Sequence, residues 1–323
     1  MGKNKLKGNG VRSVMKNSSS SQIVLLAIVL AVYVIIMCCL TENFYQPKNV
    51  MNILTQITPL GIAAAGAGIV MISGGIDLTI GNIVSLVGCV MAVMMSQGID
   101  NGTCVIVGLL VGLGCGAANG TLVVVSKAEP FIVTLGMMSV YKGLTLLVTG
   151  GMNITAASDY NFGRAKIAEI IPVAAVCLVA VFVALYLVFK YTKFGRRAYA
   201  IGNNTEAAYL AGVKVKRNKV FVYMLNGGLL AFAAMIMLSR LSSANSIMGD
   251  ELLMQGIAAA VIGGVSLAGG RGNLWGVFLG TVLIGVISNS LNLLSVAAYY
   301  QYIVLGAIIV GAVFVSNFRS KSR

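Results

Sequence analysis

Few residues in this chain could do chemistry, and they lie in or beside apolar segments. Asp77 follows an apolar run in the stretch ISGGIDLTIGN, Arg271 lies in AGGRGN, and Lys142 lies inside a third apolar run. Charged side chains are costly inside a membrane, so each of the three is a candidate functional residue. Two roles are open for Asp77: part of a transport path, or a cap that accepts backbone N–H groups where the next helix starts.

Simpler roles are also open for the two basic residues. Arg271 stands between glycines, so we expect it in a cytoplasmic turn, where it can contact a partner protein. Lys142 can extend its amino group along the helix toward the membrane surface, as long cationic side chains do.

The residue types that are missing argue against most catalytic chemistry. The chain has no histidine, which removes the commonest general base and the commonest transition-metal ligand. Its six cysteines match no zinc spacing. Neither G-x-x-x-x-G-K-[ST] nor G-x-G-x-x-G occurs, so the sequence predicts no nucleotide site. We therefore expect no catalytic residue, no metal and no cofactor, and a membrane-embedded enzyme is the weakest hypothesis.

The composition is that of an integral membrane protein. Of 323 residues, 58% are hydrophobic and 10% are charged, far below the roughly 25% of a soluble domain. The 39 glycines agree, because small residues let membrane helices approach closely. A net charge of +14 could indicate nucleic-acid binding, but the bases lie in loops and tails. Membrane topology explains them better, so we expect a lipid bilayer and no nucleic acid around this chain.

Apolar segments set the expected architecture. Several are shorter than the roughly 20 residues needed to span a bilayer, and some are interrupted by glycine pairs. We therefore expect an all-α, polytopic membrane protein with about ten transmembrane segments, some of them short or broken, and with residues 73–81 enclosed by protein. The predicted segments are residues 23–40, 50–72, 82–95, 104–125, 131–148, 170–189, 220–238, 253–267, 274–287 and 299–315.

The basic residues predict the orientation. With ten crossings, the bases of residues 1–22, 190–219 and 316–323 fall on one side, which should be the cytoplasm. The other side receives only Lys48, Arg164, Lys166 and Arg240. The expected organisation is a cytoplasmic tail (1–22), a transmembrane permease domain (23–315) and a cytoplasmic C-terminal tail (316–323).

Residues 190–219 form the longest polar stretch after the N-terminal tail, with eight bases and one acid, Glu206. Its middle, residues 203–213, predicts a short helix, because Asn203, Asn204 and Thr205 offer N-caps and Gly212 offers a stop. A short helix outside the membrane is well placed to bind another protein.

One pentapeptide occurs twice. GIAAA stands at residues 61–65 and again at 256–260, and a Gly-Asn pair follows each copy within about 20 residues. Paired broken helices in two halves of a transporter commonly flank its substrate route. Chance matches between Gly/Ala-rich segments are the other explanation, and both stay open.

Four stretches together resemble the ribose-type sugar permeases of bacterial ATP-binding-cassette importers. They are ISGGIDLTIGN (72–82), PFIVTLGMMSVYKGLTLLVTGG (130–151), GRRAYAIGNNTEAAYLAGV (195–213) and AAAVIGGVSLAGGRGNLWGVFLG (258–280). The resemblance implies a permease of the bacterial inner membrane that carries a monosaccharide. It also implies three partners: a second permease chain, a cytoplasmic ATP-binding-cassette ATPase and an extracytoplasmic sugar-binding protein.

The resemblance further implies that residues 190–219 are the loop that couples transport to the ATPase. Its Glu-Ala-Ala…Gly pattern falls on Glu206, Ala207, Ala208 and Gly212. Glu206 could instead serve only the first turn of its helix, through the helix dipole.

Other functions remain as alternatives. A permease for an amino acid or a nucleoside would share this machinery. An ion-driven secondary carrier would also explain broken helices. Such a carrier requires coupled carboxylates inside the membrane, and these are hard to find in this sequence.

Overall fold

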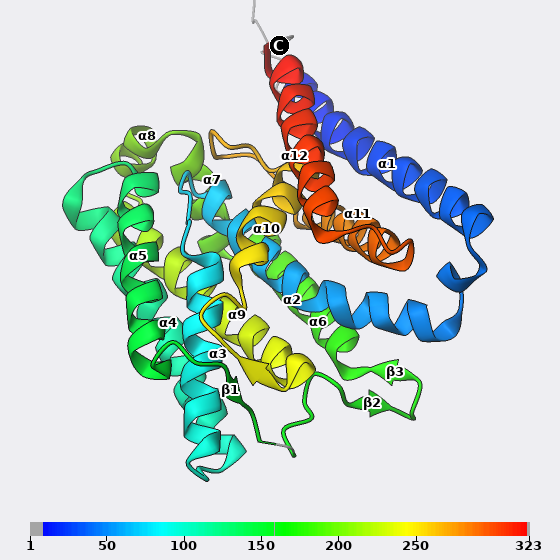
Figure 1. Cartoon of the computed structure of the whole chain (residues 1–323). Helices are drawn as coiled ribbons and strands as arrows, with labels where there is room; N and C mark the ends of the chain where they lie inside the picture. The colour runs from blue at the N-terminus through cyan, green and yellow to red at the C-terminus, as the bar shows by residue number, and fades with distance from the viewer. Residues whose placement is uncertain (1–8, 158, 322–323) are drawn as a thin grey trace, which may run out of the picture.

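The structure is a computed structural model that describes residues 9–157 and 159–321. Over these residues the regular secondary structure is helical apart from four two-residue strands, and turns and loops connect the elements (Figure 1). The elements in chain order are α1 (Asn9–Leu40), the 3₁₀ helix η1 (Glu42–Phe44), α2 (Pro47–Ile72), α3 (Ile80–Ser96), α4 (Asn101–Ser126), α5 (Pro130–Thr149), β1 (Ile154–Thr155), β2 (Lys166–Ile167), β3 (Ile171–Pro172), α6 (Val173–Tyr191), α7 (Lys193–Asn203), α8 (Thr205–Leu210), α9 (Val215–Leu241), β4 (Ser243–Ala244), α10 (Asp250–Ile262), α11 (Leu274–Leu293) and α12 (Ala298–Lys321).

The all-α prediction is confirmed, and each predicted apolar segment overlaps a helix. Two predicted bounds were wrong: residues 170–172 precede α6, where 171–172 form β3, and residues 263–267 follow the end of α10. Among the described residues, seven helices are long and apolar enough to cross a membrane: α1, α2, α4, α5, α6, α9 and α11. Two of the predicted segments form shorter helices, α3 with 17 residues and α10 with 13. The count of about ten crossings therefore stays a prediction.

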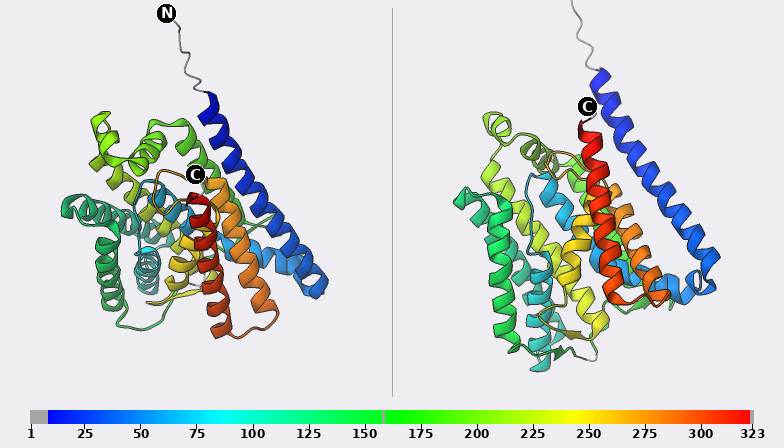
Figure 2. Two further views of the ribbon diagram at one scale, coloured as in Figure 1. Left: turned by 90° about the horizontal axis from the view of Figure 1, so that it is seen from above. Right: turned by 45° about the horizontal axis from the view of Figure 1, so that its top comes forward.

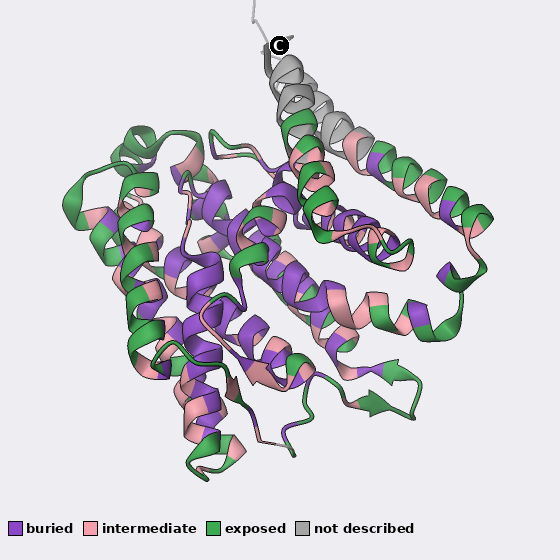
Figure 3. Ribbon diagram, viewed as in Figure 1, coloured by how far each residue is buried: buried purple, intermediate pink, exposed green. Residues whose placement is uncertain are grey.

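Helix α2 occupies the centre of the bundle. It packs against α6, α9, α10 and α11, and Figure 3 shows buried residues concentrated along it. Its small residues permit this enclosure, because neighbouring helices can approach its backbone. At Gly66, for example, an added Cβ atom would lie 2.1 Å from Oδ1 of Asn226 in α9. The sequence of α2 thus fits a helix surrounded by protein on all sides.

Helices α4 and α9 cross at close range through glycines four residues apart. Gly112, Gly116 and Gly120 of α4 face α9, and a Cβ at Gly116 would lie 2.3 Å from the carbonyl oxygen of Tyr223. On the other side of the contact, a Cβ at Gly227 would lie 2.1 Å from the carbonyl oxygen of Gly112. This is the small-residue spacing that lets membrane helices pack backbone to backbone.

The bundle has two different ends. Helices α7 and α8 lie at the same end as the start of α1 and the end of α12, and the strands lie at the opposite end (Figures 1 and 2). There β1 pairs with β4, Ile154 opposite Ala244, which ties the loop after α5 to the segment before α10. The strongly basic stretch 190–219 is therefore confined to the end that holds α7 and α8.

The structure differs from the sequence prediction at two helices. Helix α1 begins at Asn9 and runs without a break to Leu40, although residues 1–22 were expected to form a polar tail; residues 1–8 lie outside the described part. Helix α7 was not predicted, because two glycines interrupt its sequence. It forms because Gly195, Ala198 and Ile201 share one buried face, three residues apart.

Candidate functional site

The short helix predicted in the basic stretch is present as α8. Asn204 precedes it with extended backbone, and its side-chain oxygen accepts a hydrogen bond from the Ala207 N–H at 2.9 Å. Gly212 follows with a φ of +78°, a left-handed conformation that glycine adopts readily. The helix is shorter than the predicted 203–213, because Asn204 serves as its cap and the chain has already turned at Gly212.

The four residues assigned to coupling differ in their exposure to solvent. Glu206, Ala207 and Gly212 are exposed, whereas Ala208 is buried. Two apolar side chains that the sequence reasoning had not selected stand out beside them: Tyr209 is 70% exposed and Leu210 is 79% exposed. They follow the Glu-Ala-Ala pattern directly and are apolar within a basic stretch, a signal that was readable in the sequence.

Helix α7 connects α8 to the centre of the bundle through a cluster of glycines. A Cβ at Gly202, near the end of α7, would lie 2.0 Å from the carbonyl oxygen of Ile72, the last residue of α2. The N–H of Gly270 donates to the same carbonyl at 2.9 Å. Gly74 and Gly269 complete the contact, since a Cβ at Gly269 would lie 2.8 Å from both Gly202 and Gly74. We call these residues (Gly74, Gly202, Gly269, Gly270) the glycine junction.

Arg271 lies directly after the glycine junction, in the loop between α10 and α11. Its side chain is exposed, and its main-chain oxygen accepts from the Ser266 N–H at 3.0 Å. Tyr199 of α7 donates its hydroxyl to the carbonyl of Gly272 at 3.0 Å, and burial raises the pKa of Tyr199 to about 12. This geometry places Arg271 beside α7, at the end of the bundle that carries α8.

Asp77 is enclosed between α2 and α3 and is 3% exposed. One carboxylate oxygen accepts from the main-chain N–H of Thr79 at 2.9 Å, from the Thr79 hydroxyl and from the Asn119 amide at 3.5 Å. The other accepts from the Asn226 amide at 2.8 Å. Thr79, not Asp77, directly precedes α3. Asp77 thus joins the start of α3 to α4 and α9.

Further hydrogen bonds extend the Asp77 network to α5. Tyr141 donates to Asn119 Oδ1 at 2.9 Å, and Thr134 donates to the carbonyl of Ile76 at 3.2 Å. Within the described part of the chain, Asp77 has no cationic partner at ion-pair distance. Neutral donors therefore hold this carboxylate, which fits a fixed structural centre. Both roles proposed for Asp77 remain predictions.

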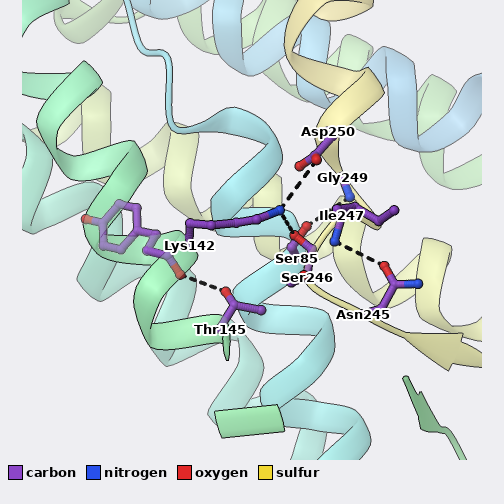
Figure 4. A network of polar contacts seen from close by, with 9 residues as sticks. Ser85, Lys142, Thr145, Asn245, Ser246, Ile247, Gly249 and Asp250 are labelled. Carbon is purple, nitrogen blue, oxygen red and sulfur yellow. Dashed lines mark hydrogen bonds and ion pairs between the residues drawn. The ribbon is translucent and has the colours of Figure 1, made fainter. Parts of the chain in front are cut away.

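A second polar network lies between α5 and the start of α10 (Figure 4). Lys142 Nζ donates to the main-chain carbonyl of Ser246 and lies 3.5 Å from Asp250 Oδ2. From the inner side, the N–H of Gly249 donates to Ser85 Oγ of α3 at 2.9 Å. The sequence left two roles open for Lys142, a functional residue or a side chain that extends toward the membrane surface. In the structure Lys142 reaches across to the first residue of α10. Asp250 was not selected from the sequence, although an Asp-Glu pair opening an apolar segment is a visible signal.

The Lys142–Asp250 pair borders an open cavity of about 540 Å³. The two side chains keep 32% and 48% of their surface exposed. Polar and apolar residues of α3, α5 and α10 share the lining: Gly81, Asn82, Met138, Ser139, Lys142, Gly143, Leu146, Asp250 and Leu253. Such a surface can accept hydrogen-bonding molecules. Among the residues the structure describes, no group of three or more His, Cys, Asp or Glu side chains could hold a metal ion.

Comparisons with known proteins cover nearly the whole chain. A family described as "Branched-chain amino acid transport system / permease component" matches residues 49–313. The chain is 42% identical to the ribose import permease of Bacillus subtilis (strain 168), covering 90% of this chain and 91% of that protein. It is 36% identical to the ribose import permease of Escherichia coli (strain K12), with coverage of 90% and 92%.

A third similar protein is named for another sugar. The D-allose transport system permease of Escherichia coli (strain K12) is 34% identical, covering 91% of each chain. No solved structure matches this chain.

Proposed function

The chain belongs to the permease family whose description names branched-chain amino acid transport systems, and on that premise we propose that it is the membrane-spanning subunit of an ATP-driven importer for a monosaccharide. The cargo is inferred from the relatives, which are named for ribose and allose although the family description names amino acids. A ribose-type sugar is therefore the first candidate. An amino acid is the second, favoured by that description alone.

One structural observation supports the proposal most directly: a partly exposed charged pair that joins the membrane-spanning helix α5 to the start of the shorter helix α10. Lys142 is seven residues from the end of α5, which corresponds to about 10 Å of helix rise. A charged side chain at the centre of a membrane helix costs about 2.5–3.5 kcal/mol. Lys142 and Asp250 are nevertheless partly exposed in the single chain. This face of α5 and α10 should therefore border a polar path rather than lipid.

A second permease chain would cover the same face. Further along α10, Glu251 is exposed and accepts a hydrogen bond from Tyr302 of α12 at 3.2 Å. On α5, a Cβ added at Gly136 or Gly143 would meet no atom within 4 Å, which leaves room for another helix. We infer that two copies, or this chain and a similar one, enclose the path between them.

Energy would come from a separate ATPase that binds α8, so the permease itself would have no catalytic role. The exposed Tyr209 and Leu210 favour a protein contact, because exposed apolar side chains beside charged ones are typical of interaction sites. Glu206 and Ala207 would border this contact, and the buried Ala208 would support the helix from within. Arg271 lies at the same end of the bundle and would contact the same partner.

The distribution of charge supports placing this permease in the bacterial inner membrane with both termini in the cytoplasm. The basic stretch 190–219 lies at the α7–α8 end, and basic segments concentrate on the cytoplasmic side. The end that carries the strands would then face outward, where an extracytoplasmic sugar-binding protein would deliver the cargo.

Purification of the tagged chain from its native membrane in mild detergent, followed by mass spectrometry, tests the proposed assembly. We expect a stoichiometric partner that contains a nucleotide-binding P-loop, together with an exported binding protein. If the chain is recovered alone and still drives ion-dependent uptake in vesicles, it is a secondary carrier and the proposal is wrong.

A further inference from the structure

The cavity beside Lys142 and Asp250 has the make-up of a small-molecule site. Its volume of about 540 Å³ lies within the range of roughly 300–1,000 Å³ that such sites occupy. Apolar walls from Met138, Leu146 and Leu253 stand beside hydrogen-bonding groups of Asn82 and Ser139. The cavity is separate from α8, and Asp77 does not line it. It is therefore distinct from the two other sites described above.

The charged pair leaves hydrogen-bonding capacity open toward this cavity. An ammonium group has three donors, and Lys142 uses two of them, on Ser246 and Asp250. A carboxylate can accept about four hydrogen bonds. Asp250 is half-exposed, and Lys142 is its one side-chain partner within the described residues. A donor and an acceptor thus stand 3.5 Å apart at the cavity wall.

The chemistry of the pair favours a neutral ligand with adjacent hydroxyl groups. Lys142 and Asp250 cancel each other's charge, so neither an anion nor a cation gains a net attraction. A hydroxyl group, in contrast, can donate to the carboxylate while a neighbouring hydroxyl accepts from the ammonium group. Hydrogen bonds to ionised groups are roughly twice as strong as neutral ones, which suits discrimination between sugars by the positions of their hydroxyls.

We propose that Lys142 and Asp250 form a sugar-contacting site of the permease itself, in which adjacent hydroxyls of the passing monosaccharide bind the two side chains. This inference rests on the proposed function and adds that the permease discriminates between sugars after the binding protein has released them. Lys142 and Asp250 are specificity-determining residues, and Asn82 and Ser139 complete the polar wall.

A purely structural role for the pair has to be separated from this one. Lys142 also ties α5 to the segment before α10 through the carbonyl of Ser246. Ser85 holds the same segment from its buried side, through the N–H of Gly249. The variant Ser85→Ala therefore removes a hydrogen bond of the same segment while keeping every side chain of the cavity wall, and it is the matched control.

The test uses the complete importer in proteoliposomes, with its ATPase and with binding protein saturated by the sugar. Uptake of labelled D-ribose is compared for the wild type, Lys142→Met, Lys142→Arg, Asp250→Asn and Ser85→Ala. We expect Lys142→Met and Asp250→Asn to lower uptake about tenfold or more, which corresponds to the loss of one charge-assisted hydrogen bond. Ser85→Ala should stay within about twofold of the wild type.

Monodeoxy analogues of ribose give a second readout that a structural role would not change. The wild type should take up at least one analogue about tenfold more slowly than ribose. The Lys142→Met variant should take up that analogue and ribose at the same rate. Lys142→Arg keeps the charge and the assembly, and it should reorder the preference among the analogues. The melting temperature of each variant complex reports folding separately.

Two outcomes would overturn the inference while leaving the proposed function intact. In the first, the wild type takes up ribose and every variant keeps its order of preference among the analogues. In the second, Ser85→Ala and Lys142→Met lower uptake equally and leave the order of preference among the analogues unchanged. The Lys142–Asp250 pair would then have only a structural role. A wild-type importer that transports neither ribose nor allose would reject the proposed sugar cargo together with this site.

Discussion

Asn226 of α9 donates its side-chain amide to the Asp77 carboxylate at 2.8 Å, although the two residues are 149 positions apart in the chain. Both side chains are buried, and Asp77 receives its other hydrogen bonds from Thr79 and Asn119. A buried carboxylate without a cation depends on such donors. The contact therefore fixes the broken segment between α2 and α3 to the far half of the sequence.

Replacing Asp77 by leucine should destabilise the protein. The change leaves the Asn226 amide without its acceptor, and an unsatisfied buried group costs about 1–3 kcal/mol. We expect a lower melting temperature in detergent and a lower yield from the membrane. Adding Asn226→Leu to Asp77→Leu should cost less than Asn226→Leu alone, since the two residues are coupled. Additive losses would contradict the contact. An Asp77→Leu variant that melts like the wild type yet fails to transport would favour a role in the path.

The sequence alone predicted the helices well and the contacts of Asp77 poorly. Long apolar runs with glycine breaks identify membrane helices, because hydrophobicity and length decide which segments can span a bilayer. Asn119 and Asn226 are polar residues within apolar segments, and the sequence gives no reason to pair either of them with Asp77. Their convergence on one carboxylate depends on how α4 and α9 pack around α2, and no local pattern records that packing.

Gly202→Ala should weaken the connection between α7 and α2. The new methyl group would lie 2.0 Å from the Ile72 carbonyl oxygen and 2.6 Å from the Gly270 nitrogen, and main-chain atoms cannot move aside cheaply. We expect a loss of about 1–3 kcal/mol of stability, as for other overpacked sites, measured by thermal unfolding of the purified protein. Gly114→Ala in α4 is the control, because nothing lies within 4 Å of its added Cβ. Equal stability of the two variants would show that close packing at the glycine junction does not stabilise the contact between α7 and α2.

Leu210→Glu should separate the permease from its ATPase without affecting its own folding. Leu210 is 79% exposed, so the substitution removes little packing within the chain. Removing a hot-spot residue at the centre of an interface costs about 2 kcal/mol or more, and Leu210→Glu also places a charge in the proposed contact. We expect the ATPase to be lost during co-purification and uptake to fall at least tenfold. Met152→Glu is the control, since Met152 is 66% exposed and lies in the loop after α5, at the strand end. Normal recovery of the ATPase with Leu210→Glu would refute docking through α8.

Thiol labelling of intact cells can check the orientation. In a background without the six native cysteines, Met152→Cys should react with a membrane-impermeant maleimide from outside. Tyr209→Cys should react only after the membrane is permeabilised, because the basic stretch around α8 is predicted to face the cytoplasm. The reverse pattern of labelling would invert the predicted topology, and with it the placement of both termini.

The candidate sites were predictable to different degrees. The cap and the stop of α8 could be assigned from Asn204 and Gly212, because turn chemistry is local. Tyr209 and Leu210 were missed, although two apolar residues within a basic stretch are a visible signal; their exposure itself depends on what packs around α8. The Lys142–Asp250 pair joins positions 108 apart in the chain, and β1–β4 pairing ties the loop after α5 to the segment before α10. No local sequence pattern records that long-range pairing. The two copies of GIAAA, at residues 61–65 and 256–260, lie in contact. A Cβ added at Gly256 would lie 3.5 Å from the main-chain nitrogen of Ala64.

Uptake of labelled D-ribose into proteoliposomes tests most directly whether this chain is the membrane subunit of an ATP-driven sugar importer. The permease is reconstituted with its co-purified ATPase and supplied with sugar-loaded binding protein. In vesicles whose ATPase faces the interior, we predict that ribose accumulates only when ATP is enclosed inside. Accumulation should stop when the ATPase is omitted or inactivated. Accumulation driven by an ion gradient without ATP, or no accumulation of ribose or allose with an active ATPase present, would contradict the assignment.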